Sequence, residues 1–165
     1  MHPIKPDPVG EGQESVWNYP RPAIAEPVPA HIRIMLGGID IVETRIAVRT
    51  LETSHPPTYY VPPKDVALGI LREVDHTSFC EWKGVARYFD VLAGGERRAR
   101  AAWTYPEPTA SFAVLRDHIA FYPEAMDACF VDGERVTPQP GGFYGGWITS
   151  AVAGPFKGVP GSRFW

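Results

Sequence analysis

Five residues of types that carry chemistry stand in two short segments of the sequence. Glu52, Ser54 and His55 place an acid, a hydroxyl and an imidazole close together, and Cys80 stands three residues before Lys83. Histidine carries protons near neutral pH, and a carboxylate within reach would fix its tautomer and raise its basicity. A thiol near an ammonium can act as a nucleophile or a redox centre. We therefore take His55, Cys80 and Lys83 as candidate catalytic residues.

The first segment also has a purely structural interpretation. On a strand, Glu52 and Ser54 share one face and His55 lies on the other, unless the turn at Pro56-Pro57 reorients the imidazole. Under that geometry Glu52 does not orient His55. The ring would instead cap the turn by bonding to the backbone, an alternative that carries equal weight with a binding role.

The second segment has a structural interpretation as well. A single cysteine is more often a small buried hydrophobe than a reactive group, and this interpretation is favoured for Cys80. Cys129, between Ala128 and Phe130, is expected in the core. Lys83, between Trp82 and a glycine, suits an anionic or carbonyl group on a ligand, or else covers a ring with its stem.

Aromatic residues in proline frames are the second feature of the sequence. Trp17 to Pro22 reads Trp-Asn-Tyr-Pro-Arg-Pro, and Trp103 to Pro108 reads Trp-Thr-Tyr-Pro-Glu-Pro, with a third such stretch at His55 to Pro63. Proline fixes its own φ and restricts the residue before it, so these rings lose little freedom when they line a pocket. The candidate ligand-binding residues are Glu52, Tyr60, Trp82, Trp103 and Tyr105.

Composition excludes several classes of function. A chain of 165 residues suits one domain, and its net charge of −3 offers no basic field for nucleic acid. No run approaches the roughly 18 apolar residues of a membrane span, and no signal segment starts the chain, so we expect a cytoplasmic protein without a membrane partner. Two cysteines cannot build a four-cysteine zinc cage, and no metal or other cofactor is expected.

Short apolar runs separated by turn residues predict the elements that position these groups. One hairpin is expected from Ile32–Leu36 and 40–44 across Gly37-Gly38, and another from 85–91 and 98–105 across Gly94-Gly95. Further strands are expected at 45–53, 58–61, 119–122 and 128–131, a short helix at 64–72, and a helical turn near 111–115. Strands far outnumber helices, and the connections are too short for βαβ units, which indicates a mainly antiparallel β fold.

Several motifs in this order closely resemble the bacterial domain-of-unknown-function 427 family. The motifs are Leu51 to Pro63, Cys80 to Tyr88, Trp103 to Pro106 and Ala120 to Pro123. Glu14 to Trp17 and Tyr19 to Pro22 precede them, and Tyr144 to Trp147 and Gly154 to Gly158 follow them. The resemblance implies a small β-tent architecture, similar to methionine sulfoxide reductase B and the ligand-binding domain of cereblon, with one or two short helices. No established activity comes with it. The zinc knuckles of that architecture have no counterpart here.

Composition along the chain predicts its organisation. Residues 1–15 are expected to form a flexible arm, 16–132 the β-tent-like domain, and 133–165 an extension rich in glycine and aromatic residues packed on it. A nucleotidyltransferase label attached to the family would need two metal-binding acids on one strand face. Asp40 and Glu43 follow Gly37-Gly38, but their odd spacing predicts opposite faces, which disfavours that activity.

Two classes of function follow from the sequence. The first is a small-molecule binding protein, or an enzyme, with an aromatic-lined pocket. The second is a protein-interaction module without chemistry, whose aromatic edges contact another protein or a second copy of the chain. The ligand is not specified, and homo-oligomers remain open. Convergence of His55 and Lys83 on one cleft is the geometry that the first class requires.

Overall fold

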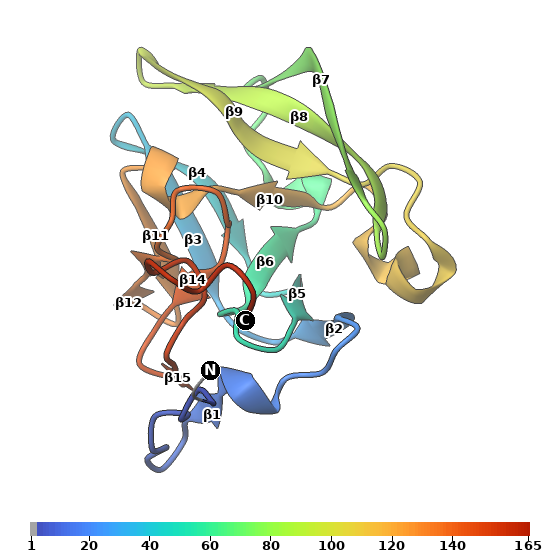
Figure 1. Ribbon diagram of the computed structural model, residues 1–165. Coiled ribbons are helices and arrows are strands. Elements are labelled where there is room, and N and C mark those ends of the chain that lie inside the picture. The colour runs from blue at the N-terminus through green and yellow to red at the C-terminus, as the bar shows by residue number, and fades with distance from the viewer. Residues whose placement is uncertain (1–2) are drawn as a thin grey trace.

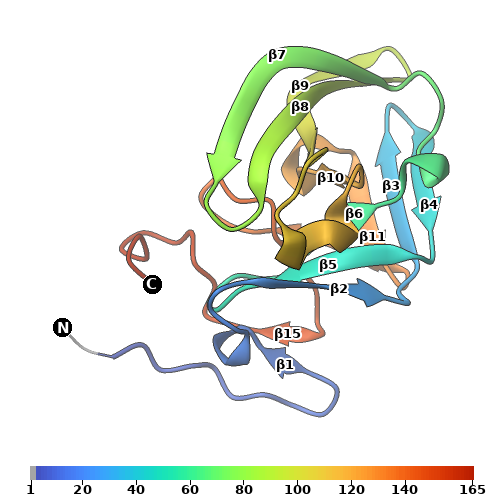
Figure 2. The same cartoon turned by 90° about the vertical axis from the view of Figure 1, so that its right-hand side faces the viewer.

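The core lies between two antiparallel β-sheets in the computed structural model, which describes residues 3–165. The larger sheet has the strand order β2-β5-β6-β10-β9-β8-β7. Its strands are β2 (Ile24–Val28), β5 (Ala47–Leu51), β6 (Thr58–Val61), β7 (Leu71–Cys80), β8 (Gly84–Ala93), β9 (Glu96–Thr104) and β10 (Ile119–Phe121). Figure 2 shows β7 and β8 arching over the rest of the molecule, so this sheet is strongly curled.

The second sheet has the order β12-β11-β3-β4. It consists of β3 (Ile32–Leu36), β4 (Ile39–Thr44), β11 (Ala128–Val131) and β12 (Glu134–Arg135). Two small ladders complete the strands: β1 (Glu14–Ser15) runs parallel to β15 (Val152–Ala153), and β13 (Thr137–Pro138) runs antiparallel to β14 (Trp147–Ile148). The helical segments are the 3-10 turns η1 (Val16–Asn18), η2 (Pro63–Asp65), η3 (Ala110–Leu115) and η4 (Pro123–Ala125). Figure 1 shows how β10 connects the two halves of the larger sheet.

The expected fold class is confirmed, since the chain is mainly β with antiparallel sheets in one domain. Both predicted hairpins form, β3 with β4 and β8 with β9, and the strands predicted at 58–61 and 128–131 have those bounds. The helical turn near 111–115 lies within η3. Among the described residues, no helix has the length and apolar character needed to cross a membrane.

The prediction of a helix at 64–72 is wrong. A single 3-10 turn forms at Pro63–Asp65, after which Val66 bridges to Val42 in the smaller sheet. Gly69 then adopts a φ of 77°, which ends any helical path, and Leu71 begins β7. The spacing of Val66 and Ile70 reflects two separate contacts with the core, not one helical face.

Alternation along β6 separates two apolar clusters that lie on opposite faces of the larger sheet. Tyr59 and Val61 join the main core, together with buried residues of both sheets. Tyr60 points the other way and joins Trp103 and Ala120 in a second cluster. One short strand therefore anchors the core on one face and supplies an aromatic wall on the other.

Part of the C-terminal segment contributes directly to the core. Trp147 is buried against Tyr59, with ring centroids 5.0 Å apart, and its backbone N–H donates to the carbonyl of Pro57 at 2.8 Å. The preceding ladder of β13 and β14 continues through a hydrogen bond from Gln139 N–H to the carbonyl of Gly146 at 3.0 Å. Residues 140–145 therefore form a loop that is closed at its base.

Candidate functional site

A cavity of about 570 Å³ opens between the loop 140–145 and the second apolar cluster, which contains Tyr60 and Trp103. Its polar lining includes Glu52, His55, Cys80, Lys83 and Arg100, and its aromatic lining includes Tyr60, Tyr88, Trp103, Tyr105, Tyr122 and Tyr144. These residues come from β6, β7, β8 and β9, from the connections between strands, and from the C-terminal loop. The size lies within the range of small-molecule sites in proteins, about 300–1,000 Å³.

A tight turn after β5 brings His55 to the cavity. The strand ends at Leu51, and the N–H of His55 donates to the carbonyl of Glu52 at 3.0 Å. Ser54 adopts a φ of 73°, a left-handed conformation that is unusual for a residue with a Cβ. The turn brings the side chains of Glu52 and His55 together, so that Nε2 of His55 lies 3.5 Å from Oε2 of Glu52. The sequence interpretation places the two side chains on opposite faces unless a turn reorients the imidazole, and such a turn forms here, directly before Pro56-Pro57.

The imidazole of His55 is held by side chains and does not cap the turn. Its Nδ1 lies 3.0 Å from Nε2 of Gln139. The Gln139 amide is oriented by backbone groups at both ends, since its Oε1 accepts from Gly146 N–H at 3.2 Å and its Nε2 donates to the carbonyl of Lys157 at 2.8 Å. An amide NH₂ can only donate, so Nδ1 accepts and the proton of the neutral ring resides on Nε2.

Burial lowers the pKa of His55 to about 4, and the positive charges of Lys157, Lys83 and Arg21 contribute to this lowering. Protonation of Nδ1 would also set two donors face to face at Gln139. The ring is therefore neutral at pH 7. Because 3.5 Å is too long for a strong hydrogen bond to Glu52, the Nε2–H of His55 is a donor with capacity for a ligand.

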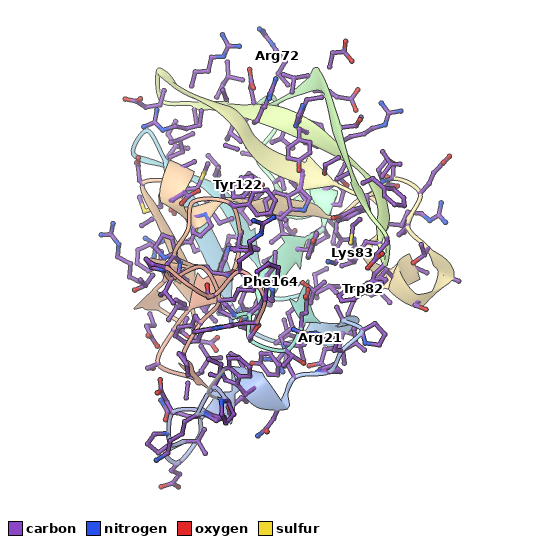
Figure 3. All side chains as sticks on the ribbon, viewed as in Figure 1. Arg21, Arg72, Trp82, Lys83, Tyr122 and Phe164 are labelled. Atoms are coloured by element: carbon purple, nitrogen blue, oxygen red, sulfur yellow. The ribbon has the colours of Figure 1, made fainter. Side chains whose placement is uncertain are left out.

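The carboxyl of Glu52 has the opposite perturbation. Burial raises its pKa, while the same three cations, Lys83, Arg21 and Lys157, act against that rise. The polar end of the cavity is thus lined by one partly buried acid, a neutral imidazole and the ammonium of Lys83, with Arg21 and Lys157 nearby but outside the lining. Figure 3 shows Lys83 beside Trp82 on the same side of the molecule as Arg21.

The aromatic wall is held by ring contacts and one hydrogen bond. Nε1 of Trp103 donates to the hydroxyl of Tyr60 at 3.3 Å, and the two rings meet edge to face. Tyr122 packs on Trp103 with centroids 4.5 Å apart, and Tyr105 lies 6.3 Å from Tyr60. Burial raises the pKa of Tyr60, Tyr105 and Tyr122, so these hydroxyls remain protonated at neutral pH.

Lys83 and Cys80 lie where β7 turns into β8. Nζ of Lys83 is 4.0 Å from Sγ of Cys80 and 5.7 Å from the centroid of Phe112. Cys80 is half-buried and lines the cavity, whereas Cys129 is buried in the main core, as predicted. Trp82 is not among the cavity-lining residues in the described part of the chain; it packs against the second apolar cluster.

The loop 140–145 forms the remaining wall. Tyr144 contacts the His55 ring with centroids 5.0 Å apart, and the exposed Phe143 packs edge to face against Tyr144. Close approach requires glycine at two positions, since a Cβ at Gly145 would collide with the ring of Trp103 and one at Gly146 with Oε1 of Gln139.

Residues 24–132 match the sequence profile of the family described as "Domain of unknown function (DUF427)". The chain belongs to this family. The matched region contains Glu52, His55, Cys80, Lys83 and the aromatic wall, whereas Gln139 and Tyr144 follow it. The site is thus completed by residues outside the matched region. No curated protein matches the chain.

The two acids considered for nucleotidyltransferase chemistry lie away from the cavity. A β-bulge between Ile34 and Met35 shifts the register of β3 and β4, so Asp40 and Glu43 pair with Met35 and Arg33 on one face. The expectation of opposite faces is wrong for this reason. Asp40 contacts Arg33 at 3.1 Å and Glu43 contacts His31 at 3.2 Å. No group of three or more His, Cys, Asp or Glu side chains in residues 3–165 is arranged to hold a metal.

Sequence reasoning missed Gln139, Tyr88, Tyr122 and Tyr144 as lining residues. Tyr122 stands in a Tyr-Pro pair like Tyr105, which is a signal that could have placed it with the other rings. Gln139, flanked by prolines in a glycine-rich segment, carries no such signal, because its role depends on a contact with His55 across 84 positions of the chain.

Proposed function

We propose that this protein binds a small organic molecule in the cavity, with His55, Lys83 and Cys80 as the groups that could act on it. The observation that carries this proposal is the arrangement of Glu52, His55, Cys80 and Lys83 around one opening, beside a wall of aromatic rings. A mostly apolar pocket with a few converging polar groups and a perturbed histidine is the usual form of a ligand site.

A fragment screen followed by two matched variants tests the proposal. Ser78 lines the cavity, whereas its exposed neighbour Thr77 is not a lining residue. Ser78→Trp fills the opening, and Thr77→Trp adds the same bulk beside it. Fragments that shift the Trp103 indole N–H signal of the native protein should lose binding to Ser78→Trp and keep it with Thr77→Trp. Equal binding to both variants, or a screen without hits at Trp103, would contradict a ligand site here.

Chemistry on a bound molecule requires its own measurement. If a fragment hit is consumed by the protein, Cys80→Ser and His55→Ala should abolish its consumption while binding at the Trp103 signal persists. Consumption that survives both substitutions would remove these two side chains from the reaction and leave the cavity as a binding site.

A protein-interaction module is the second candidate. Phe79 and Phe143 line the cavity although they are 76% and 77% exposed. Exposed aromatic residues at an opening suit an inserted side chain of another protein. Under this proposal Phe79→Ser with Phe143→Ser would abolish partner binding, and small fragments would not compete with the partner.

A further inference from the structure

Lys83, at the polar end of the cavity, indicates which charge a ligand would bring to it. Lys83 lines the cavity and is half-buried. Its Nζ contacts the sulfur of Cys80 and the face of Phe112, and no Asp or Glu side chain in residues 3–165 forms an ion pair with it. A half-buried ammonium that forms no ion pair and acts on Glu52 only from beyond ion-pair distance can receive a negative charge from a ligand.

Two more cations reinforce the positive charge at this end. Arg21 donates to the carbonyl of Thr53, and both Arg21 and Lys157 donate to a carboxyl oxygen of Trp165, the last residue of the sequence, which partly offsets their charge. Neither forms an ion pair with an Asp or Glu side chain of the described residues. Both act, with Lys83, on the carboxyl of Glu52 and the ring of His55. Lys83 lines the cavity itself, while Arg21 and Lys157 add positive charge from outside its lining.

The neutral imidazole adds a donor where an anion would be received. Gln139 occupies Nδ1 of His55, so the ring presents Nε2–H. Glu52, at 3.5 Å, only weakly engages this proton. An ammonium and an N–H donor lining one cavity match the two oxygens of a carboxylate.

The rest of the cavity suits a planar ring. Tyr88, Trp103, Tyr105 and Tyr122 line the same space as Lys83. Their π-systems contact flat ligands favourably, and the hydroxyls of Tyr105 and Tyr122 stay neutral. A ligand that uses both ends carries its anion and its ring on one small framework.

We propose, on the basis of the ligand site proposed above, that the cavity takes a ring-bearing organic acid whose carboxylate is received by Lys83 and His55 Nε2–H and whose ring lies along the tyrosine and tryptophan wall. Three probes of the same shape test it: indole-3-carboxylate, indole-3-carboxamide and 3-(aminomethyl)indole. Binding is followed at pH 7 through the indole N–H signal of Trp103 and the imidazole signals of His55.

The acid should bind about tenfold more tightly than the amide, because hydrogen bonds to charged groups are stronger than neutral ones, and the amine should bind most weakly. Lys83→Met keeps an apolar stem and should remove the preference for the acid. Lys83→Arg should retain it, and Lys83→Glu should move the preference toward the amine. Lys64→Met is the matched control, since Lys64 is exposed and outside the cavity, and it should leave the preference unchanged.

The possible results separate the ligand class from the ligand site. An amide or amine that binds as well as the acid at Trp103 overturns the acid preference and leaves the site in place. A preference for the acid that persists in Lys83→Met and Lys83→Glu removes the role of Lys83 and overturns the inference. If none of the three probes shifts Trp103, the ring-bearing acid is excluded, while the general site fails only if the broader fragment screen also fails.

Discussion

Nε2 of Gln139 lies 3.0 Å from Nδ1 of His55 and thereby determines which nitrogen of the imidazole carries its proton. Gln139 is 2% exposed, and its amide is fixed by the N–H of Gly146 and the carbonyl of Lys157. A residue of the C-terminal segment thus defines the donor that the histidine offers to the cavity. In a neutral ring this assignment decides whether a ligand meets a donor or an acceptor.

The titration of His55 is the first prediction. Burial and three nearby cations, Lys157, Lys83 and Arg21, lower its pKa from 6.5 to about 4, so the ring should stay neutral and protonated at Nε2 down to about pH 5. Nitrogen chemical shifts of the imidazole, followed from pH 8 to pH 4, measure both properties. A ring that charges near pH 6.5 would contradict the effect of burial and of the nearby cations, and a neutral ring with its proton on Nδ1 would contradict the Gln139 geometry.

The same shift makes stability depend on pH. The unfolded chain binds a proton at His55 near pH 6.5 and the folded chain only near pH 4, so the stability from the neutral ring is complete above pH 6.5. It falls as the pH drops toward 4, by roughly 3 kcal/mol at most. Glu52 acts in the opposite sense, because a raised carboxyl pKa removes stability as the pH rises through it.

Urea unfolding of the native protein and of His55→Asn at pH 7 and pH 5 isolates the histidine contribution. The Oδ1 of asparagine can accept from Gln139 as Nδ1 does, and asparagine does not titrate. The native protein should lose more stability than His55→Asn between the two pH values. An equal loss in both proteins would show that His55 titrates alike in the folded and unfolded chains.

Removal of the Gln139 amide should destabilise the fold strongly. Gln139→Leu leaves the N–H of Gly146, the carbonyl of Lys157 and Nδ1 of His55 without this partner, and unsatisfied buried polar groups cost about 1–3 kcal/mol each. We expect a loss of about 2–4 kcal/mol in the free energy of unfolding, below the full sum because the loop relaxes. Gln13→Leu is the control, since its partners are exposed and the expected loss is below about 1 kcal/mol.

Gly145→Ala should displace the loop from the aromatic wall. The added methyl group collides with the ring of Trp103, and overpacking of this kind costs about 1–3 kcal/mol. The indole N–H signal of Trp103 should shift, together with its bond to Tyr60. In Gly10→Ala the added Cβ meets only the flexible end of Gln13, so neither stability nor the Trp103 signal should change.

Ser54→Gly should stabilise the protein. Ser54 has a φ of 73°, and its buried Oγ has no hydrogen-bond partner in the described part of the chain. Relief of left-handed strain and of an unsatisfied hydroxyl outweighs the extra flexibility of glycine in the unfolded chain, for a net gain of about 1 kcal/mol. Ser111→Gly, at an exposed position in η3, should instead be neutral or slightly destabilising in the same thermal-unfolding measurement. A loss of stability in Ser54→Gly would show that Oγ has a partner in solution.

The sequence determines the strands most clearly where apolar alternation and turn residues agree. Gly37-Gly38 and Gly94-Gly95 stand between well-patterned strands, and both hairpins form there. β7 was not predicted. It is an edge strand whose residues are exposed along much of its length, so its sequence lacks a clear alternation of apolar and polar residues. The β-bulge between β3 and β4 was not predicted either. It adds one residue to β4 and thereby places Asp40 and Glu43 on one face.

The candidate site was predictable where reactive or aromatic side chains stand beside prolines or other aromatic residues in the sequence. His55 before two prolines, Lys83 beside Trp82 and the Tyr-Pro pairs are visible in the sequence. The contact between His55 and Glu52 was not, because it depends on a left-handed conformation at Ser54 that serine rarely adopts. Gln139 was not visible either, since only the folded chain brings it to the ring.

The hydrogen bond from Gln139 to His55 joins the segment after residue 132 to the region that the family profile matches, so both parts of the chain determine where the imidazole of the cavity carries its proton. A chain cut after Asp132 would lose Gln139 and also the buried ring of Trp147, so the imidazole would lose its partner together with part of the core that supports β6. The acid–base behaviour of His55 therefore depends on a residue outside the region that the family profile matches.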